Sequence, residues 1–216
     1  AHTSFKETVY MLELPKVEPK FITEGMQLFR DYLDGMLLGE KEIDKERGII
    51  LSEKLSRDSI DYRTMLAGYS FALPESLLPK RLPIGTEETI KTMPRPRFVD
   101  FYSKWYTTDR ATVVVVGDFK DANAIVAEIK THFADAKAAP KAVADPSLGK
   151  ISTGHGVIAK LHTEMEAQAL TLSIELQHAA ANKPDTGAER RVKLIRAIAD
   201  SMVNQRLSKL AKAEGA

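Results

Sequence analysis

Residues 41–58 have the sequence KEIDKERGIILSEKLSRD, and the interpretation of the whole chain starts from this stretch. Its pattern of apolar and charged residues favours one amphipathic helix. The residues that we expect to face the core are Ile43, Ile50 and Leu51. Glu46 and Glu53 are seven residues apart, and a helix of 3.6 residues per turn brings the second side chain almost to the direction of the first. The two carboxylates can therefore point at one cation.

A charged, solvated helix face is the alternative interpretation of the same spacing. Charged side chains on helices are usually exposed and pair with neighbours three or four positions away. The cations available for such pairing are Lys45, Arg47, Lys54 and Arg57. Spacing alone favours this alternative.

Residues 43–53, IDKERGIILSE, resemble the distal-glutamate helix of the pitrilysin/insulinase zinc metallopeptidases, the inverzincins, which include the mitochondrial processing peptidases. In that family an H-x-x-E-H helix supplies two histidine ligands and a general-base glutamate. The third zinc ligand is the second glutamate of an E-x6-E pair. The resemblance implies that Glu53 is a zinc ligand and that Glu46 is its supporting acid.

Further segments are similar to the same family and follow in its order. They are residues 1–10, 83–90, 101–106 and 111–118, so the resemblance covers about residues 1–135. An ordered set is more specific than any one member. In the family an edge strand near this start takes substrate backbone as an added strand. The resemblance implies that Ala1 and His2 are the remnant of that substrate-binding strand, although His2 stands where an aromatic residue is usual.

The chain departs from the family pattern because it contains no H-x-x-E-H. Its histidines are His2, His132, His155, His162 and His178, and no two are four residues apart. We therefore expect an internal fragment of a larger protein that lacks the histidine-bearing helix. Such a fragment donates one zinc ligand, needs the missing histidines to bind zinc, and is inactive alone.

Composition excludes several function classes. The 31 basic and 30 acidic residues give a formal charge of +1, which provides no bulk attraction to nucleic acid or to an anionic membrane. Cysteine is absent, so any metal is held by nitrogen and oxygen ligands. No apolar run of 18 residues and no N-terminal signal is visible, and the compartment stays open. A periplasmic or secreted location is compatible with a bacterial parent.

The predicted class is α/β (α+β), a mostly antiparallel sheet packed with helices. Strands are expected at residues 3–14, 112–116, 157–161 and 169–176. Helices are expected at residues 19–37, closed by Gly39, and at 41–58, 62–73, 98–106, 122–133 and 188–213, with Thr86 as the N-cap of a further helix. Between the expected strands, His162, Glu164 and Glu166 have metal-ligand spacing, but a polar turn is the favoured interpretation.

Three regions are expected from the changes in composition along the chain. Residues 1–135 are the C-terminal part of an N-terminal peptidase-like domain, and residues 136–154 are a linker rich in Ala, Lys and Pro. Residues 155–216 begin a second, homologous α/β domain.

The predicted function is a fragment of a zinc metalloendopeptidase that cleaves peptides or unfolded proteins. Its partners are a peptide substrate and the remainder of the parent chain or a homologous subunit, without nucleic acid or a membrane segment. Self-association is expected from apolar faces that a truncated fold exposes. The alternative is a non-catalytic scaffold or partner subunit of the same fold.

Overall fold

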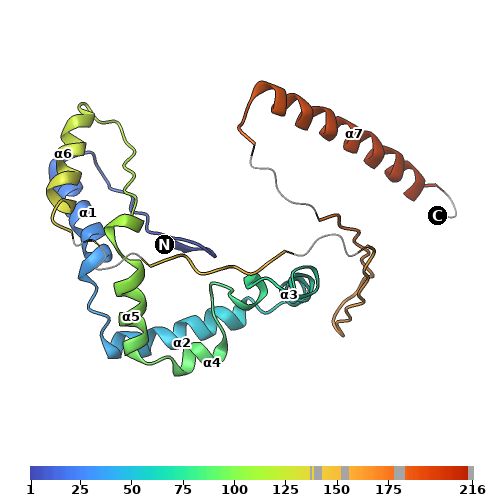
Figure 1. Cartoon of the computed structure of the whole chain (residues 1–216), viewed down its shortest axis with the longest axis horizontal. Coiled ribbons are helices and arrows are strands. Elements are labelled where there is room, and N and C mark those ends of the chain that lie inside the picture. The colour runs from blue at the N-terminus through green and yellow to red at the C-terminus, as the bar shows by residue number, and fades with distance from the viewer. Residues whose placement is uncertain (137, 139–142, 152–155, 178–182, 214–216) are drawn as a thin grey trace. The chain divides into compact units, whose positions relative to one another are not determined.

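The structure is a computed structural model that describes residues 1–136, 138, 143–151, 156–177 and 183–213 (Figure 1). The chain divides into two compact units, residues 1–170 and residues 171–216. The first unit holds every element except the last helix, α7 (Gly187–Ala211). It also holds both glutamates of the predicted cation site.

The N-terminal segment is a short antiparallel hairpin. Strand β1 (His2–Thr3) pairs with β2 (Thr8–Val9), and His2 lies opposite Val9. The prediction of one strand over residues 3–14 is therefore wrong. The amide of Ser4 donates to the carbonyl oxygen of Glu7 at 2.9 Å, which closes a turn inside the predicted strand.

The first predicted helix ends earlier than expected. Helix α1 (Pro19–Arg30) is followed by a π-helical turn, η1 (Asp31–Gly35), and by residues 36–39, which have no regular secondary structure. The Tyr102 hydroxyl explains the change, because it accepts from the Met36 amide at 3.2 Å and donates to the Tyr32 carbonyl at 2.9 Å. Tertiary hydrogen bonds thus accompany the end of helical structure at Gly35, two residues before the predicted end.

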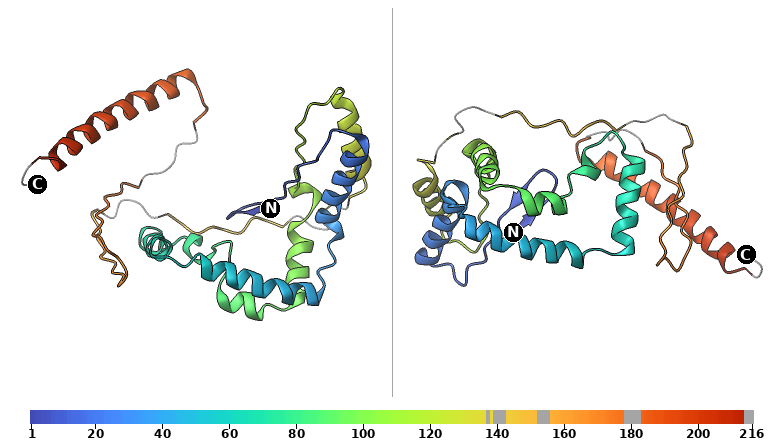
Figure 2. Two further views of the ribbon diagram at one scale, coloured as in Figure 1. Left: turned by 180° about the vertical axis from the view of Figure 1, so that it is seen from behind. Right: turned by 90° about the horizontal axis from the view of Figure 1, so that it is seen from below.

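Most of the other predicted helices are confirmed with small shifts at their ends. They are α2 (Glu40–Ser56), α3 (Ile60–Ala72), α5 (Arg95–Trp105), α6 (Ala122–Phe133) and α7. The remaining helices are α4 (Glu87–Thr92) and the 3-10 turns η2 (Leu78–Lys80) and η3 (Thr108–Arg110). Thr86 caps α4 as predicted, because its side chain accepts from the Thr89 amide. Helices α1 and α6 lie side by side, as do α2 and α4 (Figure 2).

The predicted sheet is only partly present. Residues 112–116, 157–161 and 169–176 form no ladder in the described part of the chain, where β1 and β2 are the only paired strands. A strand needs a partner as well as β-branched side chains. The valine run is covered on one side only, since Val113 and Val115 are half-buried whereas Val114 is 73% and Val116 90% exposed. The α+β class itself is confirmed by helices combined with an antiparallel pair.

An aromatic cluster holds the hairpin against η1 and α5. The rings of Tyr10 and Tyr32 are stacked with centroids 4.6 Å apart, and the Tyr10 and Tyr106 hydroxyls lie 2.7 Å apart. Burial, with help from the Tyr106 hydroxyl, raises the pKa of Tyr10. Ile22 and Met26 of α1 are the buried apolar side chains among the described residues. The core of the first unit is therefore small.

Part of the predicted linker is fixed to the first unit. The amide of Leu77 donates to the Leu148 carbonyl at 2.8 Å, and the amide of Lys150 donates to the Glu75 carbonyl at 3.2 Å. Other linker residues, 137, 139–142 and 152–154, lie outside the described residues. The domain boundaries at 135 and 155 stay predictions. Among the described residues, none of the helices combines the length and the apolar character needed to cross a membrane.

Candidate functional site

One stripe of α2 faces the rest of the first unit. Ile43, Arg47, Ile50 and Lys54 follow one another at spacings of four, three and four residues, which places them on one side of a helix. The two isoleucines are half-buried, and so is Leu51. The Lys54 Nζ donates to the Gly85 carbonyl at 3.4 Å. This stripe carries the contacts of α2 with α4 and the loop before it.

Arg47 makes the strongest contacts of this stripe. Its guanidinium donates to the carbonyl oxygens of Ile90 and Met93, the latter at 2.5 Å, and its Nε lies 3.0 Å from the Asp44 carboxylate. The same guanidinium lies over the Phe98 ring, 5.7 Å from the centroid. Only 18% of the side chain is exposed. Arg47 therefore connects α2 to the end of α4 and to α5.

Both predicted site glutamates lie on the neighbouring stripe of α2. Glu42, Glu46, Ile49 and Glu53 follow one another at the same spacings, and all four are exposed. Since one residue corresponds to a rotation of about 100°, this stripe lies a quarter to a third of a turn from Arg47. Glu46 and Glu53 are thus presented together on an exposed side of α2.

The two carboxylates differ in their surroundings. Glu53 forms an ion pair with Arg57 one turn further along α2, and 47% of its side chain is exposed. Glu46 has no ion pair with any residue in the described ranges and lies at the edge of a groove. Of the cations in the solvated-face alternative, Arg57 is thus the one that pairs with a site glutamate.

The groove beside Glu46 is mostly apolar. It lies between α2, α4 and the segment that leads into α2. The apolar side chains that line it include Met36, Leu38, Ile43, Ile50, Ile90 and Phe98. Arg47 forms part of its wall, whereas Glu53 does not reach it.

The histidines in the described part of the chain do not complete a metal site with Glu46 and Glu53. The Nδ1 of His132 lies 3.0 Å from the Glu128 carbonyl oxygen on α6, and His2 belongs to β1. His155 and His178 lie outside the described residues. Within the described ranges, no three His, Asp or Glu side chains are grouped to hold a metal. Among the described residues, the α2 face that carries Glu46 and Glu53 therefore offers carboxylates without a histidine beside them.

The His162-Glu164-Glu166 spacing belongs to an ion-pair cluster. Arg63 of α3 donates to Glu164 at 3.1 Å and to Glu166 at 2.9 Å, while His162 Nε2 lies 3.2 Å from the Glu164 carboxylate. Hydrogen bonds to Glu166, Asp58 and Glu164 raise the pKa of the Arg63 guanidinium. The carboxylates neutralise an arginine, which agrees with the turn interpretation.

Ala1 and His2, the predicted substrate-binding residues, are exposed at the start of the hairpin. His2 pairs with Val9 on one side of β1. The other edge of β1 has no ladder partner in the described part of the chain. An open edge of this kind offers unpaired backbone groups to an added strand.

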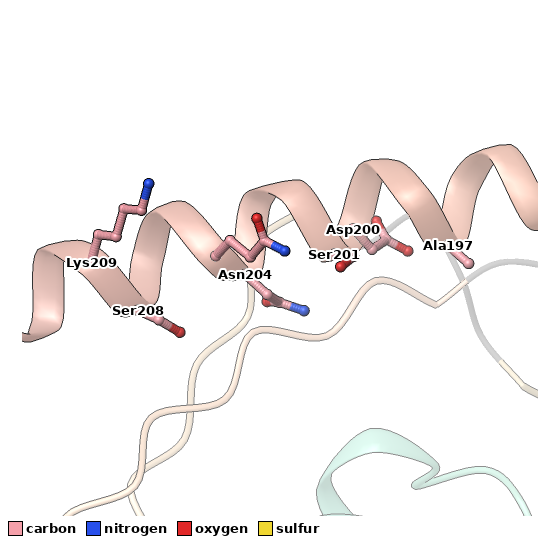
Figure 3. Close-up of a pocket in the computed structure, with 7 residues that line it drawn as sticks. Ala197, Asp200, Ser201, Asn204, Ser208 and Lys209 are labelled. Carbon is pink, nitrogen blue, oxygen red and sulfur yellow. The ribbon is translucent and has the colours of Figure 1, made fainter.

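A shallow hollow is lined by residues of α7 alone. Figure 3 shows side chains that line it, all carried by this one helix. The lining residues are Ala197, Asp200, Ser201, Asn204, Gln205, Ser208 and Lys209. It contains one carboxylate and no histidine, so it has no set of metal ligands.

The sequence offers Arg47 as a candidate ion-pair partner for the glutamates, whereas in the structure it binds backbone carbonyls of another helix. The signal that it does more was its place between Ile43 and Ile50, because a charged residue inside an apolar stripe needs a buried partner. Which partner it finds is not encoded locally, since the carbonyls of Ile90 and Met93 lie more than 40 residues away.

Comparisons with known proteins agree with the resemblance seen in the sequence. The sequence profile described as "Peptidase M16 inactive domain" matches residues 92–188. The probable zinc protease PqqL of Escherichia coli (strain K12) is 31% identical over 145 residues, which are 66% of this chain and 16% of that protein. The probable zinc protease PqqL of Haemophilus influenzae is 28% identical over 215 residues, 98% of this chain and 23% of that protein.

A solved structure supports the same relationship. The first half of the periplasmic protease PqqL from Escherichia coli matches with a TM-score of 0.59 and 27% identity, over 65% of this chain and 30% of that chain. The chain thus spans less than a quarter of the two curated PqqL relatives. These matches confirm the predicted resemblance: the chain is similar to zinc peptidases of the pitrilysin/insulinase type, and the matched M16 domain covers residues 92–188, which are less than half of the chain.

Proposed function

We propose that this chain supplies the third zinc ligand, Glu53, and its supporting acid, Glu46, to a zinc metalloendopeptidase that cleaves peptides or unfolded proteins. The observation that carries the proposal is the shared stripe of α2, which presents both carboxylates on a face that is not packed against α4. Relatives named as zinc proteases add support. The proposed enzyme is longer than this chain, as those relatives are.

Glu53 fits a zinc ligand because its carboxylate is accessible and its ion pair with Arg57 is an exposed one that a cation can replace. Zinc in catalytic sites takes three protein ligands, so two imidazoles come from the remainder of the protein. The histidine-bearing helix then lies against the glutamate stripe. Glu46 supports the site from a position almost two turns away on the same side of the helix, where it can accept hydrogen bonds from zinc-bound or imidazole groups.

Bound zinc supplies a water whose pKa is lowered to about 7 and a Lewis acid for the scissile carbonyl. The contribution of this chain is to hold carboxylates toward that position. The chain alone has one zinc ligand at this face and is inactive. Cleavage requires the remainder of the parent chain or a homologous subunit.

The substrate approaches along β1 in this proposal. The open edge at Ala1 and His2 accepts an extended peptide as an added strand, which gives affinity through backbone hydrogen bonds and little sequence preference. A peptide or an unfolded protein is the substrate class that can adopt this conformation. The solved relative is a periplasmic protease, and we assign the same compartment to this protein as part of the proposal.

The test uses the full-length protein that carries this chain. Glu53→Gln and Glu46→Gln are compared with Glu42→Gln, which changes a carboxylate on the same stripe outside the E-x6-E pair. Zinc content and cleavage of an unfolded protein are measured. We expect Glu53→Gln to lose both zinc and cleavage activity. Glu46→Gln should show a tenfold to hundredfold loss of zinc binding or of cleavage activity, and Glu42→Gln should match the wild type. Equal zinc and equal cleavage in all four proteins contradict the proposal.

A non-catalytic partner subunit of the same fold is the second candidate function. The observation that favours it is the match of residues 92–188 to a domain described as inactive. The two functions differ in the upstream helix, which carries H-x-x-E-H in an enzyme and substituted residues in a scaffold. Sequencing the complete open reading frame distinguishes them.

A further inference from the structure

We infer that Arg47 is a positioning residue for the proposed zinc-binding glutamates, fixing the rotation of α2 about its axis and thereby the direction of Glu46 and Glu53. The inference rests on the proposed function of Glu53. It concerns a residue that touches neither the proposed metal nor the substrate, and it follows from how α2 is attached to the rest of the first unit.

Helix α2 has no buried residue among the 17 that form it. Its apolar contacts come from Ile43, Ile50 and Leu51, which are only half-buried. Apolar contact is non-directional and tolerates rotation of a partly buried helix. The orientation of α2 therefore depends on its directional contacts, which are hydrogen bonds.

Two cationic side chains provide directional contacts to backbone carbonyls. Arg47 reaches the carbonyls of Ile90 and Met93, and Lys54 reaches that of Gly85 at 3.4 Å. Arg47 makes the larger contribution, because its planar guanidinium binds two acceptors in a fixed geometry while an ammonium acts as a point charge. The face of the same group also contacts Phe98, which leaves it little freedom to turn.

The carbonyls that Arg47 binds are suited to this role. Ile90 belongs to the last turn of α4 and Met93 is its C-cap, and the last carbonyls of a helix lack partners inside the helix. Arg47 satisfies these carbonyls and is held by them. Glu46 directly precedes Arg47, and Glu53 lies seven positions after Glu46. A rotation of α2 that breaks these bonds therefore turns both carboxylates away from the proposed zinc position together.

Arg30 provides a matched control elsewhere in the first unit. It is 17% exposed, against 18% for Arg47, and it also donates to a carbonyl at the end of a helix, that of His132 on α6, at 2.7 Å. It joins α1 to α6, and its hydrogen bonds and ion pairs with described residues are to Asp34, Asp135 and the His132 carbonyl, none of which belongs to α2. Loss of Arg30 thus disturbs folding through a similar bond without changing the orientation of the glutamates.

The experiment compares Arg47→Met, Arg47→Lys and Arg30→Met in the full-length protein, with Glu53→Gln as the reference for loss of the ligand. Zinc affinity is measured by competition with a chelator, and the unfolding temperature is measured on the metal-free protein. We expect Arg47→Met to weaken zinc binding tenfold to a hundredfold, Arg47→Lys to recover part of that loss, and Arg30→Met to keep wild-type affinity despite a comparable fall in unfolding temperature.

Two results overturn the inference in distinguishable ways. The first result is that Glu53→Gln loses zinc but Arg47→Met keeps wild-type zinc affinity, or that Arg30→Met weakens zinc binding as much as Arg47→Met does. In either case Arg47 has no specific positioning role, and the proposed function stands. If Glu53→Gln binds zinc as the wild type does, the proposed function fails and the inference fails with it. Should Arg47→Met not fold, Arg47→Lys against Arg30→Met decides the question by the same criteria.

Discussion

Glu53 is paired with Arg57, one helical turn further along α2. A metal that takes the Glu53 carboxylate competes with this guanidinium. In the proposed zinc site, Arg57 neutralises the Glu53 carboxylate while no metal is bound, so the strength of this ion pair is part of the proposed metal affinity.

Removal of Arg57 should therefore tighten zinc binding. An exposed ion pair is worth about 0.2–1 kcal/mol, and about 1.4 kcal/mol corresponds to tenfold, so Arg57→Gln raises the zinc affinity of the full-length protein by up to about fivefold. Chelator competition at low salt measures the change. Lys91→Gln, which removes a similar i,i+4 pair with Glu87 on α4, is the control and leaves affinity unchanged. A weaker affinity in Arg57→Gln contradicts the expectation.

Position 149 requires glycine because its backbone has a positive φ and because the Glu75 backbone lies close to it. Its φ is +85°, and a Cβ at this position lies 2.2 Å from the Glu75 carbonyl oxygen. Gly149→Ala should destabilise the first unit by about 1 kcal/mol or more, because strain at positive φ adds to the clash.

Gly68→Ala on α3 is the opposite case. Apart from the backbone of its own helix, no heavy atom lies within 4 Å of the new methyl group, so the substitution should stabilise by up to about 1 kcal/mol. Denaturant midpoints measure both, and a Gly149→Ala midpoint at or above that of the wild type disproves the prediction.

The pair between Arg30 and Asp135 should make stability depend on pH at acidic values. The hydrogen bond from Arg30 lowers the pKa of Asp135 below its usual value. A lowered folded-state pKa gives a contribution that is complete above the unfolded value of about 3.9 and is lost as the pH falls through the folded value. The wild type should therefore exceed Asp135→Asn in unfolding midpoint at pH 6, and the difference should shrink as the pH falls below about 3.9 and vanish below the folded-state pKa of Asp135.

Asp118→Asn is the control for this titration, because Asp118 has no ion pair with any described residue. It should follow the wild type across the whole pH range. A constant difference between wild type and Asp135→Asn from pH 6 to pH 2.5 excludes an ionic contribution.

The sequence predicted the helices better than the sheet, for a physical reason. Helix hydrogen bonds are local, so the stretch around Glu46 and the cap at Thr86 are encoded by neighbouring residues. A strand depends on hydrogen bonds to a partner strand, and the periodicity of a sequence does not identify that partner. Val114 and Val116, for example, are exposed in the structure. Register and pairing therefore could not be derived.

The candidate site shows the same division. The common direction of Glu46 and Glu53 follows from their spacing and is present on α2. The pairing of Glu53 with Arg57 was one of several possible local pairs. The role of Arg47 depends on carbonyls from a distant helix and on a ring of α5, which no local pattern specifies.

Self-association of the isolated 216-residue chain is a further prediction. Leu194 and Ile198 of α7 are each more than half exposed, although their periodicity is that of a packed face. Light scattering over a concentration series should detect oligomers. Replacing both residues with Gln should reduce association, whereas replacing Ser201 and Ser208 with Gln should not. A single species with the mass of one chain at every concentration contradicts this prediction.

The most direct test of the central claim is a crystal structure of the full-length protein with zinc located by its anomalous scattering. The account predicts a zinc ion with a carboxylate oxygen of Glu53 about 2.0–2.2 Å away, two imidazoles in its coordination shell, and Glu46 outside that shell. A zinc ion bound elsewhere, with Glu53 still paired to Arg57 and directed into solvent, would contradict it.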